Sequence, residues 1–498
     1  MARALKPLVL AIDIGSSSVR TALFVEAGAR IIDSTASQHY SLNYTAEGGA
    51  ELDPGVLLRG AQSCVSQTLR MREKSPTHCR LPIIAVAASA FWHSLLGLDR
   101  NGRVLTPVFT WADSRSAADA AALRRTISER RIQLRTGCML RAAFWPAKLH
   151  WLRRTRPALF KNVQSWVSPA AWIFRELFGF EATSHSMASG TGLYNLPEEK
   201  WDADLCDLSD VGLEQLGPLR DSARAKPEVR KELRDAVIFA AIGDGAASNL
   251  GSGADAPGKF AINVGTSGAV RALQRKDQRP RTQVPRGLFK YVVDRDRFVI
   301  GGAVSNAGNL HRWCLRELNL GGEKQAEKEL SRTAAAEDSL TVLPFWVNER
   351  APTWPVDLRG TINGLTPVTT AADVFRAAAT STFYRLAEIL EQLQSVLGEA
   401  EEVIVSGGIL HSPASLAILA DSLGCEIRVC REPESSLRGA SIHALEQLGQ
   451  AVKAPPAGQL IRHRPALAAK HRARREQQNA LEQRLASLAD LRDATAHR

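Results

Sequence analysis

Two aspartates stand where an apolar run ends, a place where a side chain can meet a bound ligand. Asp244 follows the run 237–242 and lies between two glycines. Its carboxylate can accept a proton from an attacking hydroxyl group. With a reference pKa of about 4 it is a weak base, but phosphoryl transfer tolerates this because positioning does most of the work. The alternative is a helix N-cap, a position that aspartate favours, and the residue pattern does not separate the two.

Asp13 ends an earlier apolar run, close to the turn 15–18. A carboxylate at this place can hold Mg²⁺, directly or through water, because Mg²⁺ prefers oxygen ligands and keeps several waters. An aspartate that caps its own turn is the alternative.

Two segments of the chain resemble each other without a gap. Residues 10–23 and 260–273 share an Ala-Ile pair, a glycine, a serine two positions on and a closing Ala-Leu pair. Each pattern predicts a strand, a tight turn of small polar residues and a second strand. Such tips bring backbone N–H groups and hydroxyls together and can bind an anion. We therefore expect two related domains that face one phosphate chain; two unrelated glycine turns are the alternative. The tip residues are Gly15, Ser16, Ser17 and Ser18, and Gly265, Thr266, Ser267 and Gly268.

Two further segments combine an aromatic ring with polar hydrogen-bonding groups. One contains His93 and Ser94 after Trp92, and the other contains Trp111 and Asp113. A flat apolar face with several donors and acceptors suits a polyol. Core packing is the alternative for each segment.

The elements that must position these residues alternate between strands and helices. Apolar runs at 83–87, 237–242 and 403–406 predict strands, and helical patterns cover 54–72, 115–131, 146–154, 169–178 and 371–397. This alternation predicts α/β layers. Small residues and proline cluster at 251–259 and predict a domain boundary. That cluster matches most of a P-loop pattern, but Phe260 follows its lysine and a strand follows in turn, so we interpret it as a linker.

The bulk composition excludes several classes of protein. A chain of 498 residues exceeds what one hydrophobic core supports, which predicts two or three domains. Seven scattered cysteines without a C-x-x-C pair argue against a disulfide framework or a zinc site and fit a reducing cytoplasm. No stretch of about 18 uncharged apolar residues predicts a transmembrane span. We expect a cytoplasmic protein and leave a homodimer open.

The net charge of +11 reflects a basic excess near the end of the chain. Residues 453–498 look like an appendage, a basic helical tail that begins near two prolines. A basic tail can attract nucleic acid or an anionic membrane, but the solvated face of a helix is the simpler interpretation. We expect neither nucleic acid nor a membrane as a partner.

With these residues assembled, the chain resembles the FGGY carbohydrate kinase family from about residue 8 to about residue 450, and within it the gluconokinase branch. Eight markers occur in the family's order: Asp13–Ser18, Trp111–Arg115, Ala188–Gly192 with Trp201-Asp202, Gly243–Gly245, Val264–Ser267, Glu349–Pro352, Ser406–Gly408 with Ala420-Asp421, and Arg438–Ala440. His93–Leu96, Thr110–Asp113 and Gly245 after the aspartate are the markers of the gluconokinase branch.

The resemblance implies an α/β fold of two actin-like ATPase (ribonuclease H-like) domains with an interdomain cleft. It implies a sugar-binding domain at 7–250, a nucleotide-binding domain at 257–450 and an unassigned tail at 453–498. The implied activity is transfer of the γ-phosphoryl group of ATP to a primary hydroxyl of a sugar acid such as gluconate. A pentulose kinase such as a xylulokinase, or an inactive sugar- or nucleotide-binding regulator, is the alternative.

The resemblance also assigns roles to residues. Asp244 is the implied general base, Asp13 helps to place Mg²⁺, and the two hairpin tips hold the β- and γ-phosphates. The adenosine borders Gly407, Gly408 and Ser412, and the substrate lies near His93, Ser94, Trp111, Asp113 and Asp244. Ser415 and Ala417 stand where the family usually has Trp and Gln, which leaves the adenine contacts open.

Overall fold

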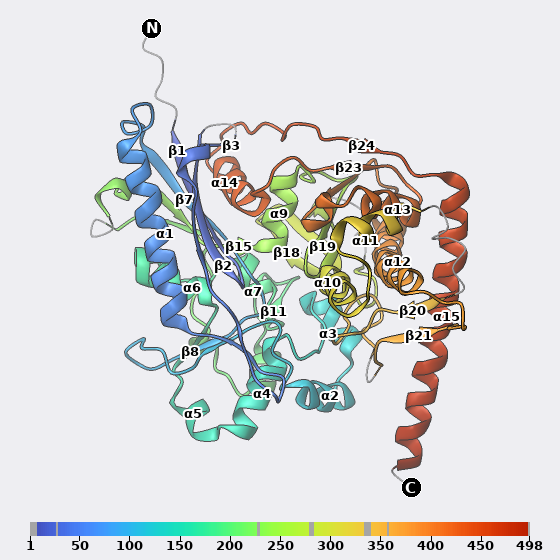
Figure 1. Cartoon of the computed structure of the whole chain (residues 1–498). Coiled ribbons are helices and arrows are strands. Elements are labelled where there is room, and N and C mark those ends of the chain that lie inside the picture. The colour runs from blue at the N-terminus through green and yellow to red at the C-terminus, as the bar shows by residue number, and fades with distance from the viewer. Residues whose placement is uncertain are drawn as a thin grey trace.

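Two mixed sheets, each covered by helices, form the framework of the molecule (Figure 1). The computed structural model describes residues 7–25, 28–226, 230–277, 283–332, 340–355 and 358–496, with side chains up to residue 488. We call residues 7–252 the N-terminal lobe and residues 259–496 the C-terminal lobe. The last two residues of the basic tail lie outside the described residues.

The N-terminal lobe has an eight-stranded sheet in the order β13-β14-β7-β1-β2-β3, with β15 paired to β7 and β4 paired to β2. At its centre β1 (Leu8–Ile14) runs antiparallel to β2 (Ser18–Val25) and parallel to β7 (Ile83–Ala90). The remaining strands are β3 (Ala29–Arg30), β4 (Ala36–His39), β13 (Ser222–Arg224), β14 (Val237–Phe239) and β15 (Ile242–Gly243).

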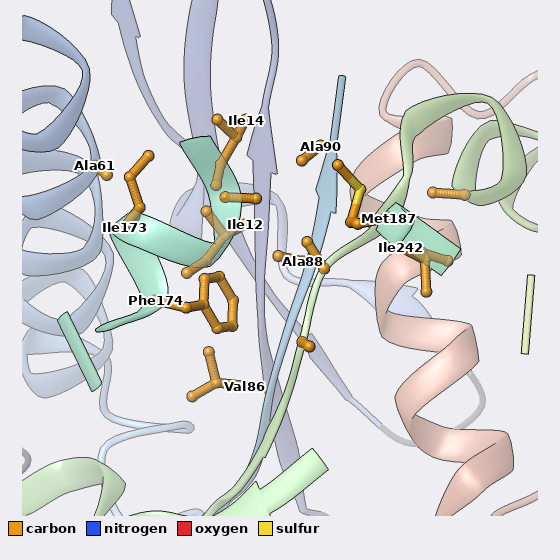
Figure 2. Close-up of a cluster of buried hydrophobic side chains, with 14 of the residues drawn as sticks. Ile12, Ile14, Ala61, Val86, Ala88, Ala90, Ile173, Phe174, Met187 and Ile242 are labelled. Carbon is orange, nitrogen blue, oxygen red and sulfur yellow. The ribbon is translucent and has the colours of Figure 1, made fainter. Parts of the chain in front are cut away.

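Both faces of this sheet are covered, which explains why its central strands are apolar along their whole length. On one face Ile12 and Val86 pack against α1 (Pro54–Lys74) and α6 (Pro169–Phe178), as Figure 2 shows with Ala61, Ile173 and Phe174. On the other face Ala11 and Ala87 pack against α14 (Ser435–Gln447).

The C-terminal lobe repeats this arrangement in a seven-stranded sheet, ordered β18-β19-β17-β16-β22-β23-β24. Strand β16 (Lys259–Val264) runs antiparallel to β17 (Gly268–Arg275) and parallel to β22 (Glu402–Ser406). Both hairpins predicted from the internal resemblance are therefore confirmed. The outer strands are β18 (Phe289–Val292), β19 (Arg297–Val304), β23 (Ile427–Val429) and β24 (Leu460–Ile461), and α12 (Ala371–Leu397) and α13 (Pro413–Leu423) cover the sheet.

The helix predicted at 115–131 is wrong in its extent, because two helices occupy this region. Helix α2 (Ala117–Thr126) ends at Ile127, whose backbone is extended, and α3 (Glu129–Thr136) begins after Ser128. The hydroxyl of Ser128 accepts the backbone N–H of Arg131, so a polar cap starts a new helix there.

Smaller elements complete the two lobes. The strands are β5 (Asn43–Tyr44), β6 (Ala50–Leu52), β8 (Leu96–Leu98), β9 (Val108–Phe109), β10 (Ser165–Val167), β11 (Tyr194–Asn195), β12 (Lys200–Trp201), β20 (Thr341–Leu343) and β21 (Thr361–Asn363). The helices are α4 (Trp145–Thr155), α5 (Pro157–Asn162), α7 (His185–Ser189), α8 (Ala203–Leu208), α10 (Gly308–Glu317) and α11 (Glu323–Leu330).

The lobes are joined where α14 crosses α9 (Asp244–Ser252). The two backbones touch: a Cβ atom on Gly439 would lie 1.7 Å from the carbonyl oxygen of Ala247, and one on Gly251 would lie 1.8 Å from that of Ser435. Arg438 donates a hydrogen bond of 2.8 Å to the carbonyl of Gly251. Since α9 begins at Asp244, this crossing sets the position of that residue.

The basic tail is packed onto the C-terminal lobe rather than set apart from it. Strand β24 extends the sheet beside β23, and α15 (Pro465–Ala496) runs along the outer side of the lobe (Figure 1). Arg464 forms a 2.5 Å ion pair with the buried carboxylate of Asp421. No helix among the described residues is both long and apolar enough to cross a membrane.

Replacing Gly439 with alanine should lower the free energy of unfolding by about 1–3 kcal/mol or more, because the added methyl group would meet backbone that cannot rotate away. Denaturant unfolding measures this. Gly60→Ala in α1 is the matched control, since its methyl group would meet Gln38 at 3.5 Å and alanine favours helix. Equal stability of the two variants would contradict the tight crossing.

Candidate active site between the lobes

Asp244 occupies the first position of α9, and the N-cap is Gly243. The N-cap interpretation of Asp244 is therefore wrong. Its Oδ1 accepts the backbone N–H of Gly245 at 2.7 Å. Burial raises the pKa of Asp244 to about 6, with the Asp13 carboxylate adding to the rise and Arg271 and Arg350 opposing it. A carboxylate with a pKa near the working pH is well suited to accept a proton.

Trp92 explains the glycines around this aspartate. A Cβ atom would lie 1.8 Å from the indole ring at Gly243, 2.4 Å from it at Gly190 and 3.0 Å from it at Gly245. The indole N–H donates to the carbonyl of Ser186 at 3.0 Å, which fixes the ring. The Trp92 ring therefore fits only because residues 190, 243 and 245 have no side chain.

Two arginines of the C-terminal lobe face Asp244, and the sequence reasoning assigned neither a role. Arg271 lies on β17, and its buried Nε has no hydrogen-bond partner among the described residues. Gly245 leaves room for it, because a Cβ atom there would lie 2.7 Å from this Nε. Arg350 stacks over Trp111 at 5.2 Å and donates to Ser305 Oγ at 3.0 Å.

Neither guanidinium forms an ion pair with a carboxylate in the part of the chain that the structure describes. Burial lowers the pKa of Arg271 and of Arg350. Arg350 could have been found from the sequence, because it lies within the family marker Glu349–Pro352. Arg271 follows the second hairpin tip with no motif around it.

His93 is held in an uncommon backbone conformation, with φ of 67°. Its Nδ1 lies 2.5 Å from the carbonyl oxygen of Gly190, so Nδ1 carries the proton and Nε2 is left as an acceptor. Burial lowers the pKa of His93 to about 3, so the ring is neutral. Ser94 is buried, and its hydroxyl lies 3.4 Å from the carbonyl oxygen of Trp92.

Lys148 of α4 lies beneath His93 and was missed because its helix has no motif. Its Nζ donates to the carbonyls of His93 at 3.0 Å and of Ala143 at 2.6 Å. Burial lowers the pKa of Lys148 to about 7, and the charge of Asp113 opposes this. The lysine therefore ties the His93 backbone to the Asp113 network.

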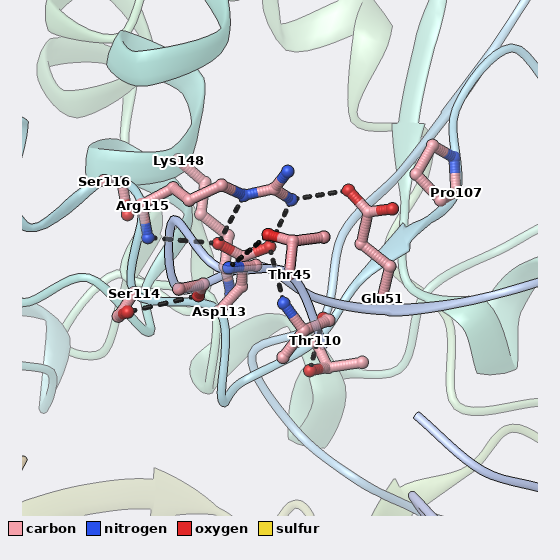
Figure 3. A network of polar contacts seen from close by, with 12 residues as sticks. Thr45, Glu51, Pro107, Thr110, Asp113, Ser114, Arg115, Ser116 and Lys148 are labelled. Atoms are coloured by element: carbon pink, nitrogen blue, oxygen red, sulfur yellow. Dashed lines mark hydrogen bonds and ion pairs between the residues drawn. The ribbon is translucent and has the colours of Figure 1, made fainter. Parts of the chain in front are cut away.

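Asp113 is the centre of a network of polar contacts (Figure 3). Arg115 binds its carboxylate with Nε at 3.1 Å and Nη2 at 2.5 Å, and the same Nη2 lies 2.6 Å from Glu51. The backbone N–H of Ala50 also donates to Asp113, at 3.3 Å. Because this buried carboxylate is already engaged, Asp113 holds together the segments that carry Ala50, Glu51 and Arg115.

The two hairpin tips have similar turns, but the second is one residue shorter: Ile14 pairs with Val19 in the first hairpin and Val264 with Gly268 in the second. The N–H of Gly15 donates to the carbonyl of Ser18 and that of Gly265 to the carbonyl of Ser267, both at 2.9 Å. Space around Gly265 is open, since a Cβ atom there would have no neighbour within 4 Å. Among the described hydrogen bonds, the N–H groups of four tip residues donate to no partner: Ser16, Ser17, Thr266 and Ser267. Unpartnered N–H groups at an open tip fit an anionic group.

Asp13 lies beneath the first tip. Its carboxylate accepts hydrogen bonds from Ser89 and, at 2.5 Å, from Arg20, which also pairs with Glu434 at 2.6 Å. No group of three potential metal-ligating side chains occurs in the described parts of the chain. Mg²⁺ is commonly bound by one or two carboxylates together with substrate phosphates. Asp13 fits an ion that arrives with a nucleotide, since the described residues provide no protein cage.

Gly407 and Gly408 follow β22 beside the second hairpin. Gly407 has φ of 96°, and a Cβ atom there would lie 2.6 Å from the carbonyl oxygen of Val264, so glycine is required. Ser412 caps α13, and its hydroxyl donates to Glu327 at 2.6 Å. Glu327 was missed, although its other oxygen accepts the N–H of Ala414 at 2.8 Å. The buried Ser415 hydroxyl lies 2.8 Å from Ser412.

The structure thus brings Asp13, Asp244, Arg271 and Arg350 into one electrostatic cluster between the lobes. The charges of Lys148 and Arg350 help to lower the pKa of His93, and the charge of Asp113 raises the pKa of Lys148. Arg350 therefore connects His93 and Trp111 to the charge cluster of Asp244, and Lys148 connects His93 to Asp113.

Asp244→Asn should stabilise the protein at pH 8 by an amount on the order of 2 kcal/mol. A carboxyl whose folded pKa is raised from about 4 to about 6 loses stability as pH rises through that window, and the asparagine does not. Thermal and denaturant unfolding at pH 4, 6 and 8 measure the difference, which should vanish at pH 4.

Asp294→Asn provides the control of opposite sign. Although burial raises it, the adjacent His443 ring and the hydrogen bonds and charge of Arg297 hold the pKa of Asp294 below its usual range. Its replacement should therefore cost stability at pH 8. A pH-independent effect of Asp244→Asn would contradict the raised pKa.

Comparisons with known proteins agree with this geometry. Models of the N-terminal and C-terminal domains of the FGGY family of carbohydrate kinases match residues 8–251 and 260–447. The chain is 28% identical over 461 residues to a gluconokinase of Bacillus subtilis, covering 89% of this chain and 88% of that protein. It is 27% identical over 454 residues to a glycerol kinase of Stenotrophomonas maltophilia, covering 87% and 88%.

Solved structures extend the match to the fold. A gluconate kinase from Lactobacillus acidophilus superposes with a TM-score of 0.86 at 25% identity, covering 97% of this chain and 98% of that one. A xylulose kinase from the same organism gives 0.86 at 25% identity, covering 96% and 98%. The expected α/β fold of two actin-like ATPase domains is confirmed. The chain belongs to the FGGY family of carbohydrate kinases, which are phosphotransferases with an alcohol group as acceptor.

Proposed function

We propose that this chain transfers the γ-phosphoryl group of ATP to a primary hydroxyl of a sugar acid such as gluconate. The observation that carries the proposal is the setting of Asp244, which lies near Arg271 and Arg350, two guanidinium groups that form no ion pair with a carboxylate within the described residues. A site with spare positive charge beside its base suits an anionic acceptor.

In this proposal Asp244 accepts the proton of the attacking hydroxyl. The pKa of this carboxylate, raised to about 6, lies closer to neutral pH than that of an ordinary aspartate, which makes it a stronger base. The neutral His93 offers Nε2 as an acceptor to a substrate hydroxyl, and the ring of Trp111 offers an apolar face. Closure of the lobes keeps water, a competing acceptor, away from the phosphoryl group.

The two hairpin tips hold the phosphates through their unpartnered N–H groups. Mg²⁺ neutralises phosphate charge when it is bound, and Asp13 would help to hold it. Gly407, Gly408 and Ser412 border the adenosine. Ser415 and Ala417 stand where the family usually has Trp and Gln, and the Glu327 carboxylate lies beside Ser412.

The sugar-acid assignment is supported by Arg271. Arginine matches a carboxylate geometrically and keeps its charge when it is buried. Arg271 reaches the site because residue 245 is a glycine, and its Nε is unpartnered in the described structure. The identity to gluconokinases over most of the chain points the same way.

A pentulose kinase is the second candidate, favoured by the equal TM-score of the xylulose kinase. An inactive regulator is disfavoured because Asp13, Asp244 and both tips are present. The domain limits, the cytoplasmic location and a homodimer stay predictions, as does the absence of a nucleic-acid partner.

A panel of gluconate, xylulose, ribulose and glycerol with ATP and Mg²⁺ tests the proposal. Gluconate should give the highest kcat/KM, and Asp244→Asn should lower kcat by roughly 10²-fold or more while leaving nucleotide binding largely intact. Coupled ADP release measures turnover. A preference for a neutral sugar would overturn the substrate, and near-normal turnover of Asp244→Asn would overturn the base.

Arg271→Met should raise KM for gluconate by roughly 10- to 100-fold, the loss expected for a charge-assisted hydrogen bond, with little change in KM for ATP. Arg275→Met, which alters an exposed arginine on the same strand, is the matched control. Steady-state kinetics with both substrates varied provide the measurement. An equal fall of kcat for every acceptor would instead assign Arg271 to the transferred phosphoryl group.

A further inference from the structure

Helix α15 lies beyond residue 447, where the family models end, and it docks through polar side chains. His471, Arg475, Gln478 and Glu482 are all buried, and their spacing of three and four residues places them on one face of the helix. His471 contacts the Tyr384 hydroxyl at 2.9 Å, and Arg475 pairs with Glu391 of α12 at 2.5 Å. A buried polar face fixes one docking position, because each group has a specific partner.

Glu482, the last residue of this buried face, contacts both α12 and the loop that contains Thr353. The Glu482 carboxylate binds Arg385 of α12 at 2.6 Å with one oxygen and the hydroxyl of Thr353 with the other. Arg385, with only 1% of its side chain exposed, also donates to Thr353 Oγ1 at 2.8 Å and to the carbonyl of Ala351 at 3.3 Å. Glu482 therefore ties α15 to the loop 349–353.

This loop carries Arg350 into the active site. On one side of Arg350, the buried Glu349 accepts the N–H groups of Ser305 at 2.6 Å and of Arg350 at 2.8 Å. On the other side, Ala351 and Thr353 are held by Arg385 and Glu482. The arginine side chain stacks on Trp111, and its charge interacts with that of Asp244. The loop is thus fixed from both ends, and the second anchor depends on α15.

We propose that α15 is a working part of the kinase, in which Glu482 acts as a positioning residue that holds the loop 349–353 so that Arg350 faces Asp244. Removing the carboxylate leaves the buried Arg385 with the neutral oxygens of Thr353 and Ala351, and the nearest remaining carboxylate is that of Glu388 at 3.9 Å. A buried charge that loses its partner rearranges its surroundings or unfolds them. The nearest backbone to rearrange is that of Ala351 and Thr353.

The test compares Glu482→Gln with Glu391→Gln in the full chain. The second variant breaks another ion pair between α15 and α12, one that does not contact the loop. Glu482→Gln should lower kcat by roughly 10-fold, and Glu391→Gln should leave kcat within about twofold of wild type, because only the first variant disturbs Arg350. Thermal unfolding reports how far each change weakens docking.

The pH profile separates positioning from a general loss of stability. Asp13 raises the pKa of Asp244, and Arg271 and Arg350 lower it. If Arg350 moves away, the acid limb of kcat should shift to higher pH in Glu482→Gln and stay in place in Glu391→Gln. This readout rests on the proposed role of Asp244. A wild-type profile without an acid limb would count against that role, and the kcat ratio of the two variants would then decide the case for Glu482.

Thr353→Val offers a second variant if Glu482→Gln does not fold. It removes the hydroxyl that joins Glu482 and Arg385 at an exposed position and leaves their ion pair intact. A reduced kcat with the same shift of the acid limb would support the proposal. Wild-type kcat and pH profile in a folded Glu482→Gln or Thr353→Val variant would overturn it.

Discussion

The molecule depends on one backbone-to-backbone contact, the crossing of α9 and α14. Helix α14 belongs to the second half of the chain but packs on the sheet of the first half, and α9 begins directly after the last residue of β15. Gly251 and Gly439 allow carbonyl groups of one helix to lie where a methyl group would otherwise stand. Because packed interiors do not deform continuously, this crossing sets where Asp244 lies relative to both lobes. Any rotation of one lobe relative to the other must therefore keep the contact between α9 and α14.

Around Asp244 the fold holds unlike charges close together in a half-buried place. Burial disfavours the ionised carboxylate, and the nearby Asp13 adds to this cost. Arg271 and Arg350 offset part of it, although burial weighs against their own charges. An arrangement of this kind stores electrostatic free energy that a bound anion and its metal ion can change, which is typical of sites that move charge during a reaction. Packing of neighbouring groups, including Trp92 against three glycines, offsets the unfavourable free energy of burying these charges.

The two halves are copies with different chemistry at equivalent positions. In the first hairpin Asp13 stands opposite Ser89 of β7 and accepts its hydroxyl. In the second, Asn263 stands opposite Ser406 of β22 and donates to that hydroxyl at 3.0 Å. The strand pairing is repeated, because each hairpin has an antiparallel partner strand on one side and a parallel strand on the other, although the second turn is one residue shorter. The charge is not repeated, because the neutral Asn263 stands where the first hairpin has Asp13.

The sequence by itself determined the two hairpins, most helices and the family, because strand periodicity, glycine turns and ordered motifs are local properties. It also placed Asp13 and Asp244 at strand ends, because each follows an apolar run, but it did not separate a functional role from a capping role. The spatial partners were decided only by the tertiary structure. Arg271, Lys148 and Glu327 have no local motif, and they join the site through contacts between distant segments. The tail gave the largest difference: its composition predicts a solvated basic helix, but the buried face at 471, 475, 478 and 482 is polar, so hydrophobic patterning could not reveal its docking.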